Sequence, residues 1–473
     1  MVRTSRVIVD ARPQRPVRAD LEDAAQVPPA ILGSVGTAWS PETRLYSDGV
    51  VRAVGGGPLV VPPHSNYRRI PGTCYLDQSH GWLAEAYLAA PGDVDEARTR
   101  LAQTVLPGRD GPFADLAETA LLDMEAVCLP NGAAVAAGSQ HWYYVWPRDA
   151  GYLAVAFSIL GRHRQAQDLL QYVASVQEPD GTWQARYLPD GSGRVPDDRG
   201  RQLDNSGWFL WATWVGAQLS APLKPIVPER LWGAASAALR AVIDIIDPVT
   251  GLPPPSQDYW EVDVDEVTLG VAAPLLLTLR TGADIARWRG EVSLADAARA
   301  TVSRLEAAIR DTFGGRGYPR IAGRRAGADA SIAFLLPPFA PADQAVEAAW
   351  RATFARLRLD NGGLRPGQDW PDVQTAWTPQ TSLFAMTAAV LGDTQLATEL
   401  LQWLAARTTR WGSLPEKVTA DGHPAAVAPL PLTSATVLIA LAALDGRRLP
   451  VPRSEPSSIE GDKPIRTDEG TTP

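Results

Sequence analysis

Apolar residues recur at helical spacing through most of the chain. From about residue 112 onward they stand three and four positions apart in segments of roughly 10 to 20 residues, and Gly, Pro or Asp ends each segment. The pattern predicts about twelve helices with no convincing strand between them: 113–128, 148–161, 163–177, 205–219, 229–246, 264–281, 293–313, 328–337, 341–358, 375–391, 394–408 and 432–444. Such an even series favours an all-α fold, an (α/α)6 toroid with six inner helices surrounded by six outer ones.

Long loops separate many of these segments. They fall at 129–147, 178–204, 247–263, 359–374 and 409–431. Because loops on a rigid scaffold commonly carry binding and catalytic residues, we expect the functional residues there.

The first 110 residues have a different pattern. Short β-type runs, a Gly-Gly-Gly and a Pro-Pro occur in 44–70, and a helical connector is predicted at about 93–105. We therefore expect three parts: a small N-terminal β-containing region with its connector in 1–110, the toroid in 111–445, and a disordered tail in 446–473, which is rich in Pro, Ser and charged residues.

Composition narrows the class of protein. A 45% hydrophobic and 21% charged chain is typical of soluble globular proteins. The longest apolar runs are shorter than the roughly 20 residues needed to cross a bilayer, so no membrane association is expected. The basic start lacks the apolar core of a signal peptide, and the two cysteines, Cys74 and Cys128, suit a reducing compartment, so a cytoplasmic location is expected.

Several function classes lack their usual signals. A net charge of −9 without a basic stripe argues against nucleic acid as a partner. The five histidines show no metal-ligand spacing, and there is no Cys-x-x-Cys, Gly-x-Ser-x-Gly, Walker or dinucleotide-binding motif. We therefore expect no metal and no cofactor, while the sequence leaves the oligomeric state open.

An aromatic segment, QHWYYVWPRDAGY (140–152), precedes one predicted helix. Its rings include Trp142, Tyr144 and Trp146, and they are followed by Arg148 and Asp149. Two interpretations stay open from the residues alone. The rings can be ordinary core and the charged pair a helix cap with a surface ion pair. Alternatively, the rings stack on a sugar while the charged side chains hold its hydroxyl groups.

Two loop glutamates are candidates for acid–base chemistry, because hydrolysis of a glycosidic bond needs a pair of carboxyl groups. Glu261 follows Trp260 in SQDYWEVDVDEVTLG, where an adjacent indole would raise the pKa of the carboxyl group and suit a general acid. Glu416 precedes Lys417 in RWGSLPEKVTADGHP, where a cation would keep a general base ionised. The alternatives are acids at a helix N-terminus for Glu261 and an exposed loop acid for Glu416.

Two further loops suit recognition of hydroxyl groups. QLDNSGW contains Asp204, and GGLRPGQDWPD contains Arg365. Both segments equally suit helix caps and turns.

In order along the chain, YYVWPRDAGY, RQLDNSGWFLWA, DYWEV, GGLRPGQDWPD and GSLPEKV resemble motifs of glycoside hydrolase family 15, the glucoamylases and glucodextranases, over about 113–445. The resemblance implies an (α/α)6 six-hairpin toroid. It also implies an inverting, exo-acting α-glucosidase that releases β-glucose from the non-reducing ends of α-glucans or short α-gluco-oligosaccharides. Glu261 would be the general acid and Glu416 the general base. The substrate-binding residues would be Trp142, Tyr144, Trp146, Arg148, Asp149, Asp204, Trp260 and Arg365.

The resemblance has departures. Val262 follows the expected acid where some relatives have a second acid, and the last predicted helix begins PLTSAT instead of an aromatic-rich run. The linkage therefore stays open among α-1,4, α-1,6 and α-1,1. Two other functions also remain: another (α/α)6 carbohydrate enzyme, such as a disaccharide phosphorylase or a trehalase, and a catalytically silent glucan-binding protein.

Overall fold

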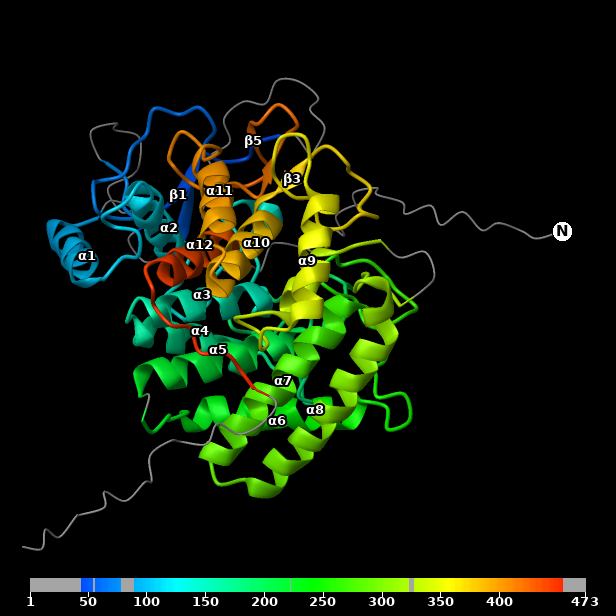
Figure 1. Cartoon of the computed structure of the whole chain (residues 1–473). Helices are drawn as coiled ribbons and strands as arrows, with labels where there is room; N and C mark the ends of the chain where they lie inside the picture. Colours follow the sequence, from blue (N-terminus) through cyan, green and yellow to red (C-terminus); the bar gives the residue numbers. More distant parts are fainter. Residues whose placement is uncertain (1–43, 54–55, 78–88, 222, 323–326, 454–473) are drawn as a thin grey trace, which may run out of the picture.

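The computed structural model describes residues 44–53, 56–77, 89–221, 223–322 and 327–453 (Figure 1). The α-helices are α1 Pro91–Gln103, α2 Ala114–Ala126, α3 Pro147–Ile159, α4 His163–Ser175, α5 Asn205–Ser220, α6 Glu229–Ile245, α7 Leu269–Trp288, α8 Val292–Phe313, α9 Gln344–Leu357, α10 Thr378–Leu391, α11 Thr394–Ala405 and α12 Pro431–Leu444. Short 3-10 helices are η4 Gln140–Trp142, η5 Gly314–Arg316 and η6 Ala330–Leu335.

Six elements form a closed inner ring. In order around the ring, α3, α5, α7, η6, α10 and α12 each contact the next, and α12 contacts α3 again. The outer helices pack against this ring: α4 contacts α3, α6 and α8 contact α7, α9 contacts η6, α11 contacts α10, and α2 contacts α12. The (α/α)6 toroid predicted from the sequence is confirmed.

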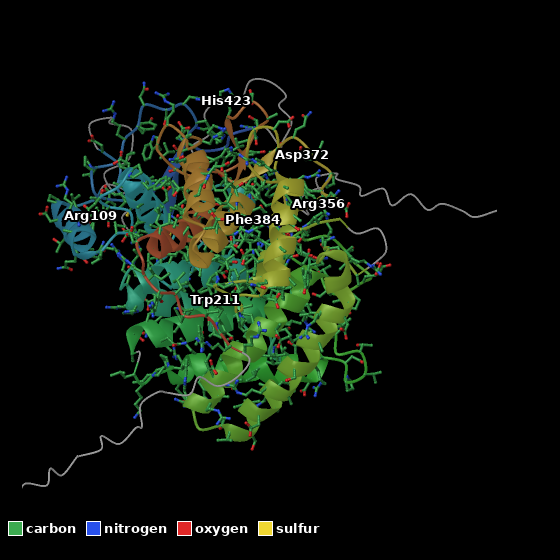
Figure 2. All side chains as sticks on the ribbon, in the orientation of Figure 1. Arg109, Trp211, Arg356, Asp372, Phe384 and His423 are labelled. Carbon is green, nitrogen blue, oxygen red and sulfur yellow. The ribbon has the colours of Figure 1, made fainter. Side chains whose placement is uncertain are left out.

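Burial explains which helices lie inside. In α12 every residue from Thr433 to Ala442 is buried, so the helix is enclosed on all sides. In α4, by contrast, the buried residues form one stripe, as expected for an outer amphipathic helix. Figure 2 shows Trp211 of α5 and Phe384 of α10 among the packed side chains of the interior, whereas His423 lies at the outer surface. By length and composition α7 could span a membrane, but 94% of its apolar window is buried inside the molecule.

Two predicted helices differ from the structure. The segment 328–337 is the six-residue 3-10 helix η6, not an α-helix, because the Asp329 side chain caps its start and Pro337 and Pro338 cannot continue it. The helix predicted to begin at residue 264 begins at Leu269. There the Leu269 N–H donates to the Arg320 carbonyl oxygen at 2.8 Å, which holds the preceding residues as a loop.

Short strands lie at the loop end of the toroid. In the N-terminal region β1 Gly49–Arg52 and β2 Pro58–Val61 form an antiparallel hairpin. A second sheet, which the sequence analysis did not anticipate, joins β3 Ala376–Trp377, β4 Lys417–Val418 and β5 Pro424–Ala425. Most of the predicted tail, 454–473, lies outside the described residues, and the proposed boundary at residue 110 stays a prediction.

Candidate active site

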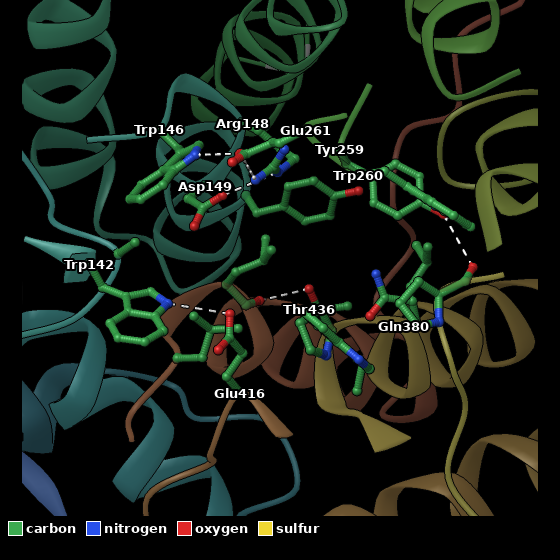
Figure 3. A pocket seen from close by; sticks show the side chains of 18 of the residues that line it. Trp142, Trp146, Arg148, Asp149, Tyr259, Trp260, Glu261, Gln380, Glu416 and Thr436 are labelled. Atoms are coloured by element: carbon green, nitrogen blue, oxygen red, sulfur yellow. Dashed lines mark hydrogen bonds and ion pairs between the residues drawn. The ribbon is translucent and has the colours of Figure 1, made fainter. Parts of the chain in front are cut away.

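A cavity of about 350 Å³ opens where the inner helices begin (Figure 3). Its walls come from the first turns of α3, α10 and α12 and from all five of the long loops predicted from the sequence. Residues separated by nearly 300 positions therefore meet in one place. Of the ten predicted site residues, seven line the cavity: Trp142, Trp146, Arg148, Asp149, Trp260, Glu261 and Glu416.

The other three predicted residues are not among those that line the cavity. The Tyr144 ring contacts the Trp146 ring edge-on, with the two ring centroids 6.2 Å apart. Asp204 is fully buried at the start of α5, where it accepts a hydrogen bond of 2.9 Å from Trp208 Nε1, and burial raises its pKa to about 6. Arg365 lies in the loop after α9, and its backbone N–H donates to Leu357.

Glu261 sits on a tight turn. Its φ angle is +55°, a left-handed conformation that is uncommon for a side chain other than glycine and is often found at functional sites. The Glu261 N–H donates to the Asp258 carbonyl oxygen at 2.8 Å. Arg320 donates two hydrogen bonds of 2.8 and 3.1 Å to the Asp258 carboxylate. The turn is thus fixed by a buried ion pair.

The Glu261 carboxylate faces positive charge. Its Oε1 accepts a hydrogen bond of 2.7 Å from Trp146 Nε1 and lies 3.9 Å from Arg148 Nη2. Its Oε2 accepts a hydrogen bond from Arg199 Nη1. Both guanidinium groups stabilise the negative charge of the carboxylate.

The indole that contacts Glu261 is Trp146, not Trp260 as the sequence analysis expected. Trp260 Nε1 instead donates to Asp329 Oδ2 at 3.0 Å, and Tyr259 donates to the other oxygen of Asp329 at 2.8 Å. Asp329 is fully buried, and burial raises its pKa to about 6. Because a buried carboxyl group needs hydrogen-bond donors, it draws the Trp260 side chain away from the glutamate that follows.

Glu416 has a different environment. Its Oε1 is 3.4 Å from Trp142 Nε1, whereas its Oε2 is buried and has no hydrogen-bond partner among the described residues. Burial raises the pKa of Glu416, and Asp149 adds to the rise, against smaller lowering effects of Lys417 and the Trp142 hydrogen bond. The expected cation is therefore present, but desolvation outweighs it. Lys417 Nζ lies over the Trp377 ring, 4.3 Å from its centroid.

Arg148 and Asp149 begin the first turn of α3. Arg148 Nε donates to Asp149 Oδ1 at 3.3 Å, while Arg148 Nη1 is buried and has no hydrogen-bond partner in the described part of the chain. Burial raises the pKa of Asp149, and its neighbour Arg148 opposes that rise. The pair lines the cavity with side-chain exposures of 14% and 10%, so it is neither a surface ion pair nor a helix cap.

Several lining residues were missed by the sequence analysis: Arg186, Arg199, Tyr259, Trp370, Trp377 and Gln380. Both arginines lie in the predicted loop 178–204, and for Arg199 the charge of DDRGR was the available signal. Trp370 makes edge contacts with Trp260 at 4.8 Å and with Trp377 at 5.2 Å, forming an aromatic wall. Gln380 Oε1 is buried and accepts no hydrogen bond from the residues that the structure describes. Among the described residues, no group of three or more His, Cys, Asp or Glu is placed to hold a metal ion.

The chain is similar to known proteins in both sequence and structure. No family model matches the chain. A curated relative, the uncharacterized glycosyl hydrolase MJ1610 of Methanocaldococcus jannaschii, is 29% identical over 148 residues, which is 31% of this chain and 23% of that protein. The match thus spans less than a quarter of the relative's length.

Solved structures are similar over most of the chain. A structure described as a wild-type glycosidase is 22% identical, with a TM-score of 0.59 over 70% of this chain and 98% of that one. A bacterial glucoamylase complexed with acarbose is 16% identical, with a TM-score of 0.59 over 76% and 59%. The glucoamylase of Saccharomycopsis fibuligera is 13% identical, with a TM-score of 0.60 over 72% and 97%. The expected resemblance is confirmed: the chain has the (α/α)6 fold of glucoamylase-type glycosidases.

Proposed function

We propose that the protein is an inverting, exo-acting α-glucosidase of the glucoamylase type. It releases β-glucose from the non-reducing end of an α-glucan or a short α-gluco-oligosaccharide. One observation carries the proposal: Glu261 and Glu416 enter the same cavity from separate loops, and each accepts a hydrogen bond from a tryptophan of one short segment, Trp146 and Trp142 respectively (Figure 3).

In the proposed reaction Glu261 is the general acid and Glu416 the general base. Glu261 gives its proton to the glycosidic oxygen as the bond from that oxygen to the anomeric carbon breaks. Glu416 takes a proton from a water molecule whose oxygen attacks the opposite face of the same carbon. The products are β-glucose and the shortened chain, and solvent returns the proton from Glu416 to Glu261. Inversion needs the two carboxyl groups roughly 6.5–9.5 Å apart, to leave room for the water.

The surroundings of Glu416 suit a base. Its free Oε2 can accept a hydrogen bond from the attacking water, since no described side chain occupies it. A raised pKa makes its carboxylate a stronger proton acceptor, and a base is most effective when its pKa approaches the working pH. Backbone contacts fix its position: the Glu416 N–H donates to Val427 at 2.8 Å, and its carbonyl oxygen accepts from the Thr378 N–H at 3.0 Å.

The cavity also offers groups that suit a sugar. Arg148 and Asp149 supply a donor and an acceptor side by side, which suits adjacent hydroxyl groups. Trp142 supplies an aromatic face on the side of Glu416, Trp260 supplies another across the cavity, and Trp377 also lines the cavity. Rings of this kind stack on the apolar face of a pyranose while charged groups fix its orientation.

The test is to incubate the purified protein with maltose, isomaltose, trehalose, maltotriose and dextran, with and without phosphate, while NMR follows the first product. We expect β-glucose first, independent of phosphate, and the substrate that yields it identifies the linkage. With maltotriose or dextran, initial α-glucose would contradict inversion. Trehalose would give β- and α-glucose in equal amounts, because its leaving glucose keeps the α configuration. Release that requires phosphate would favour a phosphorylase, and no release from any substrate would favour a glucan-binding protein.

A further inference from the structure

The proposed general acid, Glu261, forms an ion pair with an arginine. Arg199 Nη1 donates to Glu261 Oε2, and Arg148 Nη2 lies 3.9 Å from the other oxygen. A general acid must carry a proton before the reaction, and an ion pair with a guanidinium favours the deprotonated form. Protonation of Glu261 is therefore favoured when Arg199 finds another partner.

The charged groups on the Glu261 side of the cavity indicate what kind of partner Arg199 would take. The three guanidinium groups here belong to Arg148, Arg186 and Arg199. Asp149 pairs with Arg148, while Asp197 alone accepts hydrogen bonds from both Arg186 and Arg199. When Glu261 is protonated, Arg199 therefore keeps one carboxylate hydrogen-bond partner, Asp197, which it shares with Arg186.

Glu416 does not supply a second carboxylate partner for Arg199. It lies across the cavity beside Trp142, and Figure 3 shows it on the opposite side from Glu261. Donors on the Glu261 side also lack partners among the described residues, since Arg186 Nε and Arg148 Nη1 are buried without a hydrogen bond there. His141, whose carbonyl oxygen accepts from Arg186 Nη1 at 3.4 Å, lines the same side and adds no negative charge.

From these contacts, and on the basis of the proposed function, we propose that the substrate carries a negative charge, a carboxylate or a phosphate, on its leaving group, and that Arg199 binds it. The leaving group departs from the Glu261 side, so its anion comes within reach of Arg199. Arg199 exchanges Glu261 for the anion, the freed carboxyl group holds a proton, and that proton passes to the glycosidic oxygen. The anion itself is neither made nor consumed, and the net reaction remains hydrolysis.

Exposure identifies Arg199 as the residue that can make this exchange. Its side chain is 31% exposed, whereas those of Arg148 and Arg186 are 14% and 10% exposed. Arg199 also keeps a hydrogen bond of 3.1 Å to Asp197, which anchors it while its Nη1 changes partner. A binding site for an anion thus overlaps the proposed general acid.

The test compares substrates that differ only in charge. Maltobionate and maltitol share one glycosidic bond and differ by a carboxylate in place of a hydroxymethyl group. Isomaltobionate and isomaltitol form the same pair for the α-1,6 linkage. Maltose with a 6-phosphate on its reducing glucose, against maltose, tests phosphate. We expect kcat/KM to be at least about tenfold higher for the charged member of one pair, as a charge-assisted contact allows.

Substitutions test whether Arg199 causes the preference for charged substrates. Arg199→Gln should bring the ratio of kcat/KM between charged and neutral members to about one. Arg201→Gln is the matched control and should keep the wild-type ratio, because Arg201 is in the same loop but pairs with Asp180 and does not line the cavity. Equal ratios for Arg199→Gln and the wild type would overturn the role of Arg199.

Failure of this inference and failure of the proposed function give different results. If charged and neutral members are hydrolysed equally well, the anion site is wrong while the hydrolase proposal stands. If no pair is hydrolysed, calorimetry with Glu416→Gln decides. Tighter binding of the charged members, lost when Arg199→Gln is added, supports the anion site without hydrolysis, whereas equal or absent binding overturns it.

Discussion

The two sides of the cavity hold their carboxyl groups in opposite ways. On one side Glu261 sits on a turn fixed by the Asp258–Arg320 ion pair, and both its oxygens face positively charged or polar donors. On the other side Glu416 is held through its backbone, is desolvated, and has one oxygen without a partner. The first environment stabilises a negative charge, and the second disfavours it.

This difference suggests which steps depend on the substrate. The protein alone makes Glu416 a more basic carboxylate with a free oxygen, so the base is ready in the empty cavity. The acid is less ready, because the ion pair with Arg199 favours the deprotonated form of Glu261. A hydrolase built this way would protonate bonds that lack the preferred leaving group more slowly. The substitutions below test each side in turn.

The largest effect is expected from the two glutamates themselves. Glu261→Gln and Glu416→Gln should each lower turnover by about 10²- to 10⁴-fold, because each removes one proton transfer. Both residues lie in loops, so the midpoint of thermal unfolding should stay near that of the wild type. Glu399→Gln, at an exposed site on α11, is the control and should leave turnover unchanged. Near-normal turnover in either cavity variant would remove that residue from the mechanism.

A smaller loss is expected from Gly367→Ala, which acts on the Glu261 side. A Cβ atom there would lie 2.5 Å from Trp260 Cζ2 and 2.6 Å from Asp329 Oδ2, so Trp260 must move. We expect unfolding free energy to fall by about 1–3 kcal/mol, as for other overpacked sites. Turnover should fall roughly tenfold because Trp260 precedes Glu261 and small displacements of a catalytic group are costly. Gly315→Ala, which meets nothing within 4 Å, is the matched control.

On the Glu416 side, Trp142→Phe should change the pH dependence. It removes a hydrogen bond that lowers the pKa of Glu416, so that pKa should rise further. Glu416 works as a carboxylate, and turnover is lost as pH falls through its pKa. The acid limb of the kcat profile should therefore move to higher pH, with kcat at the optimum lower by roughly tenfold.

Lys417→Met tests the same acid limb of the kcat profile while leaving Trp142 unchanged. Removing the Lys417 cation also raises the pKa of Glu416. The acid limb of the kcat profile should therefore move to higher pH, as for Trp142→Phe. Measuring kcat against pH for both variants separates this effect from lost stacking on Trp142. A shift to lower pH in either variant would contradict the role of Glu416 as base.

The smallest effect is expected from Tyr46→Ala in the N-terminal region. The Tyr46 ring packs on Trp142 with centroids 5.5 Å apart, and its N–H donates to Ala426 at 2.8 Å. Losing the ring contact should lower the free energy of unfolding by about 0.5–1.5 kcal/mol. Turnover should fall a few-fold because Trp142 is then less well held, and Tyr46→Phe should restore both. Denaturant unfolding and kcat measure the two effects, and an unchanged kcat would separate the N-terminal region from the site.

The sequence predicted the helices well because their periodicity is local. The inner and outer helices could be read from apolar spacing, and the ring followed from their number and from the long loops between them. The predicted helix boundaries are wrong where contacts between residues far apart in the sequence determine the structure. Residues 264–268 stay in a loop because Leu269 bonds to Arg320, some fifty positions away, and 328–337 is shortened by its prolines.

Motif resemblance located most of the cavity but not its electrostatics. Seven predicted residues meet there, yet nothing in DYWEV shows that Trp260 turns to Asp329 or that Trp146 replaces it beside Glu261. Arg199 is sixty-two positions from Glu261, so their pairing comes from folding alone. Tyr144, Asp204 and Arg365 lie within the quoted motifs, but a position in a motif does not fix where a side chain points.

The central claim is that Glu261 acts as the acid and Glu416 as the base, and hydrolysis of α-glucosyl fluoride tests it most directly. Fluoride leaves without a proton, so a variant that lacks only the acid should still react. Glu261→Gln should lose at least about 10²-fold in kcat on the best glycoside yet stay within about tenfold of the wild type on the fluoride, whereas Glu416→Gln should lose activity on both. The reverse pattern, or equal losses of both variants on the fluoride, would contradict the assignment.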